Sequence, residues 1–224
     1  MSFTIPNIKN KKTTLICFST GIYEKKYLSA ILENNKNVDY FDNYSELNQL
    51  DKRHKNEDKA DKAIEEISQI IKMRLDPILS FGEQNSNYIL VIITDCDKAP
   101  FNAFNKLNNN IKELKCYIEN EIDIQIDYYF IFSYRGFEDW MKFYLENGEC
   151  ISNLQNIKDN IKSMIKEKHS DIFSRHKEAV NKYKQFTNYN SPLNDYQYIN
   201  KYPYSDFPYF LEYLEQQYNL HNII

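Results

Sequence analysis

The sequence contains few glycines. Only four occur among its 224 residues, namely Gly21, Gly82, Gly136 and Gly148. Phosphate loops of the G-x-x-x-x-G-K-[ST] or G-x-G-x-x-G type need closely spaced glycines, because the backbone must approach the phosphates without a side chain in between. Neither pattern occurs here, so we expect no ATP hydrolysis by a P-loop mechanism.

Cysteines are equally scarce and lie far apart. They are Cys17, Cys96, Cys116 and Cys150, and they form no C-x-x-C pair. Neither the ligand spacing of a zinc site nor the dense framework of a small disulfide-bonded domain fits them. We therefore expect reduced thiols in the core of a cytosolic protein.

Long apolar runs are also missing. No run approaches the ~18 residues that a membrane-spanning helix needs, and no basic and then apolar leader opens the sequence. These two features predict neither a membrane span nor a signal peptide, and we expect a cytoplasmic protein.

The formal net charge is -4, which argues against a protein that coats nucleic acid non-specifically. The charge is unevenly distributed, however. In residues 151–185 Lys and Arg outnumber Asp and Glu by eight to four. Such a segment is typical either of a surface that binds phosphates or of an ordinary solvated helix face.

Apolar runs and helical stripes alternate along the first two thirds of the chain. Short β-branched and apolar runs predict strands at residues 13–18, 38–41, 88–94 and 124–132. Amphipathic stripes between them predict helices, one of which should end near Asp76 because Pro77 follows. This alternation indicates an α/β fold with a mainly parallel sheet. We expect an α/β domain in residues 1–150 and a helical C-terminal extension, packed on the core, in residues 151–224.

The stretch ILVIITDCDKAP, residues 89–100, predicts a central strand that ends in two acids. Its continuous apolar run suits a strand covered by helices on both faces. Residues i and i+2 of an extended chain face the same side, so Asp95 and Asp97 can project together beyond the carboxyl end of the strand. Such a pair of hard oxygen ligands suits Mg²⁺ or Mn²⁺. The alternative is that the acids cap the helix that follows.

Two further acids are candidates for the same site. The turn after the strand at 13–18 places Glu24 in the first turn of a helix, and Glu138 lies in the helix predicted for GFEDWMKFYL. Phosphoryl-transfer sites with metal ions need several carboxylates that converge from different strands. For Glu24 the alternative is an ordinary N-terminal acid that the helix dipole favours. Phe137 and Trp140 are expected to pack in the core, and Ser133 can cap this helix.

Four segments in order resemble the RloB/AbiLii-like family of bacterial anti-phage and abortive-infection proteins. They are LICFSTGIYEKKYL, with Glu24, Tyr27 and Leu28; TDCDKAPFNAF, with the D-x-D motif; SYRGFEDWMKFYL, with Ser133, Phe137, Glu138 and Trp140; and PYSDFPYFLEYL, with Pro203 and either Leu211 or Leu214 in the corresponding phase. Ser19 stands where the family has its first glutamate, and Tyr134 and Arg135 replace an Asn and a Pro.

The resemblance implies a TOPRIM-like, Rossmannoid fold and a metal-dependent nuclease that an ABC-type or AAA-type ATPase partner controls. In this hypothesis Glu24, Asp95 and Asp97 hold Mg²⁺ or Mn²⁺, and Glu138 completes the catalytic set. Nucleic acid, RNA or tRNA rather than DNA, would contact basic side chains, namely Arg135, Lys158, Lys162 and Arg175. For Arg135 the alternative is a surface turn.

Two other hypotheses remain open at this point. Because Ser19 replaces a glutamate that in TOPRIM nucleases serves as metal ligand or general base, the protein could instead be a catalytically decayed regulatory or sensor subunit of an ATPase complex. A response-regulator-like or nucleotide-binding domain could use the same aspartates for Mg²⁺. The four histidines, His54, His169, His176 and His221, match no metal-binding spacing, and we expect them on the surface. A homo-oligomer is also compatible with the sequence.

Overall fold

The computed structural model of the chain describes residues 13–19, 21–32, 38–42, 57–81, 87–95, 101–133, 137–145, 154–167, 169–187 and 205–218. None of the helices within them is long and apolar enough to cross a membrane.

Four parallel strands form the central sheet, in the order β2-β1-β3-β4. They are β1 (Thr13–Ser19), β2 (Val38–Asp42), β3 (Asn87–Asp95) and β4 (Ile126–Ser133). The first and last residues of each strand differ by at most two positions from those that the sequence predicts. The expectation of an α/β fold with a parallel sheet is therefore confirmed.

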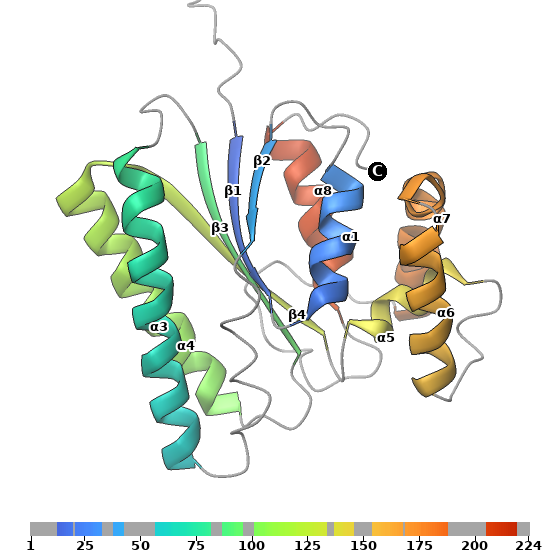
Figure 1. Ribbon diagram of the computed structural model, residues 1–224, viewed down its shortest axis with the longest axis horizontal. Coiled ribbons are helices and arrows are strands. Elements are labelled where there is room, and N and C mark those ends of the chain that lie inside the picture. Colours follow the sequence, from blue (N-terminus) through green and yellow to red (C-terminus); the bar gives the residue numbers. More distant parts are fainter. Residues whose placement is uncertain are drawn as a thin grey trace, which may run out of the picture.

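Helices cover both faces of this sheet (Figure 1). Helices α3 (Glu57–Ser80) and α4 (Phe101–Tyr117) lie on one face, and a single π-helical turn, η2 (Ile118–Ile122), continues α4. Helices α1 (Ile22–Leu32) and α8 (Phe207–Tyr218) lie on the other face. Beyond α1 lies a further helical layer of α5 (Glu138–Met141), the 3₁₀ turn η3 (Lys142–Tyr144), α6 (Leu154–Glu167) and α7 (His169–Thr187).

The two faces of the sheet have separate apolar cores. Successive residues of a strand point to opposite faces, so Leu15 and Cys17 of β1 pack with α1 and α8, whereas Ile16 and Phe18 pack with α3 and α4. All seven residues of β1 are buried. This explains why the run TTLICFS contains no alternation of polar and apolar residues.

The helices after residue 150 complete the core on the α1 face. Buried side chains from α6, α7 and α8 belong to the same apolar cluster as Leu15, Val91 and Ile93 of the sheet, and they include Ile157, Val180, Tyr183, Phe207 and Leu211. The described part of 151–224 is thus helical and shares its core with the sheet, while the expected boundary near 150 lies outside the described residues.

Helix α3 continues through Pro77 and ends at Ser80, so the expectation that it ends near Asp76 is wrong. Pro77 removes a backbone hydrogen bond only in the last turn, where few remain to be lost. Two contacts hold that turn in place: Ser80 Oγ donates to the carbonyl oxygen of Asp76 at 2.6 Å, and Leu79 is buried in the core.

We expect Phe207→Ala to lower the free energy of unfolding by about 3–5 kcal/mol, the usual cost of removing a buried aromatic ring. The Phe207 ring is fully buried, and its centroid lies 5.5 Å from that of Tyr27 and 4.9 Å from that of Phe137. Denaturant unfolding can be followed by the fluorescence of Trp140, which is the only tryptophan and is itself buried.

The matched control is Phe81→Ala, because the Phe81 side chain is 90% exposed and its loss should change the stability by less than about 0.5 kcal/mol. Equal stabilities of the two variants would contradict the placement of α8 on the sheet.

Candidate functional site

The carboxyl ends of the strands meet at one edge of the sheet, and the chain changes direction there. Strand β1 lies between β2 and β3, so the chain leaves β1 to one side and returns on the other. Open α/β sheets bind ligands beyond the carboxyl ends of the strands at such a point. In register, Ser19 of β1 pairs with Ile93, and Asp95 of β3 pairs with Ser133 of β4.

Glu24 lies at this edge, in the first turn of α1. Its side chain is only 3% exposed, and its carboxylate folds back over Gly21, so that a Cβ atom added to Gly21 would overlap Glu24 Oε2. Ser19 Oγ donates to the carbonyl oxygen of Gly21 at 3.0 Å. Glycine at position 21 therefore makes room for the acid.

Two more candidate acids lie at the end of β3 and after β4. Asp95 is the last residue of β3, and the structure describes its backbone only. Glu138 is the first residue of α5, which follows β4, and it is half-buried. Asp97 and Arg135 lie outside the described residues. The topology thus brings Glu24, Asp95 and Glu138 to the same edge.

These residues offer carboxylate oxygens, which Mg²⁺ and Mn²⁺ prefer as ligands. In the part of the chain that the structure describes, no three His, Cys, Asp or Glu side chains form a group that could hold a metal ion. The side chains of Asp95 and Asp97 lie outside the part of the chain to which this applies, because neither is described. The candidate residues are therefore of the chemical type that binds a hard divalent cation.

Ser133 has a different role from the helix cap that the sequence predicts. Its hydroxyl group forms a 3.0 Å hydrogen bond with the hydroxyl group of Ser205, while the N-cap of α5 is Phe137 without a side-chain hydrogen bond. The hydroxyl group of Tyr183 donates to the carbonyl oxygen of Ser205 at 3.0 Å and accepts from its N–H at 2.8 Å. These contacts attach the start of α8 and the C-terminal part of α7 to the carboxyl end of β4.

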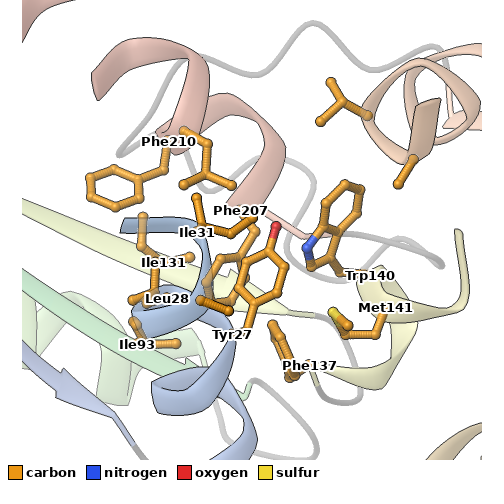
Figure 2. Close-up of a cluster of buried hydrophobic side chains, with 14 of the residues drawn as sticks. Tyr27, Leu28, Ile31, Ile93, Ile131, Phe137, Trp140, Met141, Phe207 and Phe210 are labelled. Carbon is orange, nitrogen blue, oxygen red and sulfur yellow. The ribbon is translucent and has the colours of Figure 1, made fainter. Parts of the chain in front are cut away.

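A buried hydrogen-bonded cluster holds α1 against α7. The hydroxyl group of Tyr27, one turn after Glu24, lies 2.9 Å from that of Tyr144 and 3.3 Å from His176 Nδ1, and Tyr144 lies 2.5 Å from the same nitrogen. Trp140 packs edge-on against the Tyr27 ring, and Figure 2 shows its indole nitrogen on the side of the Tyr27 hydroxyl group. Phe137 and Trp140 are buried, as the sequence predicts.

The expectation of surface histidines is wrong for His176, which is 1% exposed. His54 and His221 lie outside the described residues, and the side chain of His169 is not described. The sequence does contain a pattern that predicts the burial of His176. This residue lies three, four and seven positions before Ala179, Val180 and Tyr183, which form the buried stripe of α7. Cys17 is buried as expected, whereas Cys116 is exposed.

Burial fixes the protonation states in this cluster. Desolvation lowers the pKa of His176 to about 4, because burial disfavours the charged imidazolium form. Among the described residues, no negatively charged group is hydrogen-bonded to the ring to offset this effect. Desolvation also raises the pKa of Tyr27 and of Tyr144. All three groups are therefore neutral at pH 7, and the cluster is a set of neutral hydrogen bonds between α1, η3 and α7.

Some of the basic side chains in residues 151–185 form ion pairs with acids. Arg175 is exposed on α7, whereas Lys182 pairs with Glu178 at 2.7 Å and Lys184 pairs with Glu212. Lys158 and Lys162 lie on α6, and their side chains are not described. No protein-family model, no curated protein and no solved structure matches the chain.

We expect Gly21→Ala to destabilise the protein by about 1–3 kcal/mol, because the added methyl group must push the buried Glu24 carboxylate out of place. In a Glu24→Ala background the same substitution should cost much less, since the overlapping oxygen is gone. Denaturant unfolding of the wild type, both single variants and the double variant gives the coupling energy. Additive effects would mean that Glu24 does not lie over Gly21.

The free energy of unfolding should fall as the pH is lowered through the interval between 6.5, the ordinary pKa of histidine, and about 4, that of His176. In this interval the unfolded chain binds a proton that the folded protein excludes, which amounts to about 3 kcal/mol. The His176→Gln variant should lack this part of the pH dependence. Urea unfolding at a series of pH values measures both proteins, and identical slopes would contradict a buried neutral His176.

Proposed function

We propose that the protein is a metal-dependent, TOPRIM-like nuclease whose site lies at the carboxyl edge of the sheet, beside β1 and β3. The observation that supports it best is the convergence of acids on this edge. Glu24 lies buried at the start of α1, Asp95 ends β3, and Glu138 starts α5 after β4. Carboxylates from several strands are what metal-dependent cleavage of a phosphodiester requires.

The proposed roles follow from the residue types. Glu24, Asp95 and Asp97 would hold Mg²⁺ or Mn²⁺, and Glu138 would complete the carboxylate set. A bound divalent ion would supply an activated water and neutralise charge on the phosphate. Burial at the turn between β1 and α1 restricts the rotamers of Glu24 and keeps its carboxylate at the edge of the sheet. The basic residues Arg135, Lys158, Lys162 and Arg175 would position the nucleic-acid backbone.

The resemblance to RloB/AbiLii-like proteins gives the proposal its biological setting. By that resemblance the protein would act in anti-phage defence, cleave RNA or tRNA rather than DNA, and be controlled by an ABC-type or AAA-type ATPase. No P-loop pattern occurs in the sequence, which is compatible with a separate ATPase subunit.

One observation favours a second candidate, a catalytically decayed regulatory or sensor subunit of an ATPase complex. Ser19 stands in the place of the family's first glutamate, and it is buried with its hydroxyl group bonded to the carbonyl oxygen of Gly21. It offers no carboxylate to a metal ion or to a water molecule. This alternative predicts weak or no binding of divalent ions.

The test is cleavage of total RNA and of plasmid DNA by the purified chain with Mn²⁺ or Mg²⁺, resolved on gels. Asp95→Ala should reduce cleavage by about 100-fold or more, the usual cost of removing one group that stabilises the transition state. The matched control is Asp123→Asn, at an exposed residue before the amino end of β4. Its φ of 56° suits Asn as well as Asp, so the variant should cleave like the wild type.

Cleavage that survives Asp95→Ala would overturn the nuclease proposal. Where the wild type itself does not cleave, thermal unfolding with millimolar Mn²⁺ separates the remaining candidates. A protein that binds the ion is stabilised by it, and the stabilisation should disappear in Asp95→Ala. A wild type that Mn²⁺ does not stabilise would support the decayed regulatory subunit.

A further inference from the structure

A groove runs along the surface between α7 and η3. Two hollows of about 290 and 280 Å³ adjoin there, because both are lined by Phe143 and Lys182. We call it the α7 groove, and its other lining residues are Tyr144, Arg175, Glu178, Gln185 and Phe186.

The α7 groove follows one face of the helix. Its residues on α7 are separated by three, four and seven positions, the spacing of neighbours on a helix surface. From Arg175 to Phe186 the face is roughly 16 Å long at 1.5 Å per residue. This face lies beside the buried stripe of α7 that contains His176 and Tyr183. One side of α7 therefore packs on the core, and the adjacent side lines the groove.

Phe186 gives the groove an aromatic surface. Its side chain is 51% exposed. Its ring packs edge-on against Phe143 with centroids 5.8 Å apart, and Lys142 Nζ lies 5.1 Å from the Phe186 centroid and 5.0 Å from that of Phe143. The ring therefore packs on Phe143 and Lys142 on one side and is accessible to solvent on the other.

The charges in the groove are mainly positive. Arg175 and Lys182 face one acid, Glu178, whose carboxylate pairs with Lys182 at 2.7 Å. The Lys182 ammonium lowers the pKa of Glu178 by hydrogen bonding and by its charge. The Glu178 side chain is 66% exposed, and exposed pairs of this kind contribute little stability. Lys182 can therefore exchange Glu178 for a phosphate at low cost.

We propose that the α7 groove binds single-stranded nucleic acid, with backbone phosphates at Arg175 and Lys182 and a base stacked on Phe186. Proteins that bind single strands combine a basic groove with exposed aromatic rings in this way. The inference rests on the proposed nuclease function for its role in the protein, because the groove would guide the strand toward the acids of the sheet edge.

The hydrogen bonds of Tyr183 connect the helix that lines the groove to that edge. Tyr183, next to Lys182 on α7, bonds to Ser205, and Ser205 bonds to Ser133 at the carboxyl end of β4. Ser133 in turn pairs in register with Asp95. The part of α7 that carries Lys182 and Phe186 is thus connected through Ser205 to the carboxyl end of β4.

The experiment measures binding without cleavage. A short fluorescein-labelled single-stranded RNA and a DNA of the same sequence are titrated in EDTA, and fluorescence anisotropy gives the affinity at several salt concentrations. Phe186→Ala should weaken binding about ten-fold, the usual cost of losing one base stack. Arg175→Gln and Lys182→Gln should each reduce the slope of log affinity against log salt by about 0.7.

Two matched controls remove the same side-chain types elsewhere. Phe81→Ala removes an exposed phenylalanine that is not in the groove, and Lys177→Gln removes an exposed lysine of α7 outside the groove lining. Phe81→Ala should bind like the wild type, and Lys177→Gln should bind better than Lys182→Gln. Phe186→Leu, which keeps an apolar side chain on Phe143 but cannot stack, should bind like Phe186→Ala and unfold at the wild-type temperature.

Wild-type affinity in Phe186→Ala and Lys182→Gln, or no measurable binding by the wild type, would overturn the inference and leave a protein partner as the occupant of the groove. The two proposals fail separately. Binding that depends on Phe186, in a protein that neither cleaves nor is stabilised by Mn²⁺, contradicts the nuclease alone. Cleavage that is unchanged in the groove variants contradicts the groove alone.

Discussion

The rest of the structure depends on the burial of β1 and β3 on both faces. A parallel strand that meets no water needs a helix layer on each side and a crossover connection to its neighbour. Here α3 and α4 form one layer, and α1 with α8 forms the other (Figure 1). Because all four strands are parallel, every strand ends at the same edge, and the residues that follow β1, β3 and β4 gather there whatever their distance in sequence.

The sequence predicts this framework well because burial on two faces has a clear pattern. Continuous runs such as TTLICF and ILVIIT can hardly occur on a half-exposed strand, and both form strands. Helix ends are less predictable. Pro77 is a strong stop signal by its local chemistry, but the burial of Leu79 outweighs one lost hydrogen bond, and that packing depends on residues distant in sequence.

In the candidate site too, features that depend on local sequence are predictable, whereas contacts between distant residues are not. The sequence places Glu24 at the start of a helix and Asp95 at the end of a strand, and the fold brings both to one edge. The fold of the Glu24 carboxylate over Gly21 and the bonding of Ser133 to Ser205 follow from contacts that no periodicity encodes. His176 is the instructive case: helical spacing indicates its buried face, yet its partners Tyr27 and Tyr144 come from other elements.

The Tyr27 cluster connects the two halves of the chain at the proposed site. Glu24 and Tyr27 are three residues apart on α1, so any tilt of that helix moves both. Tyr27 is held by Tyr144 and His176, which lie in the outer helical layer. Because all three groups are neutral at pH 7 and enclosed by aromatic rings, their mutual alignment is not screened by salt as an exposed ion pair would be. The position of Glu24 therefore depends on helices beyond residue 150, and α7 aligns the acid with one face while it presents a basic groove with another.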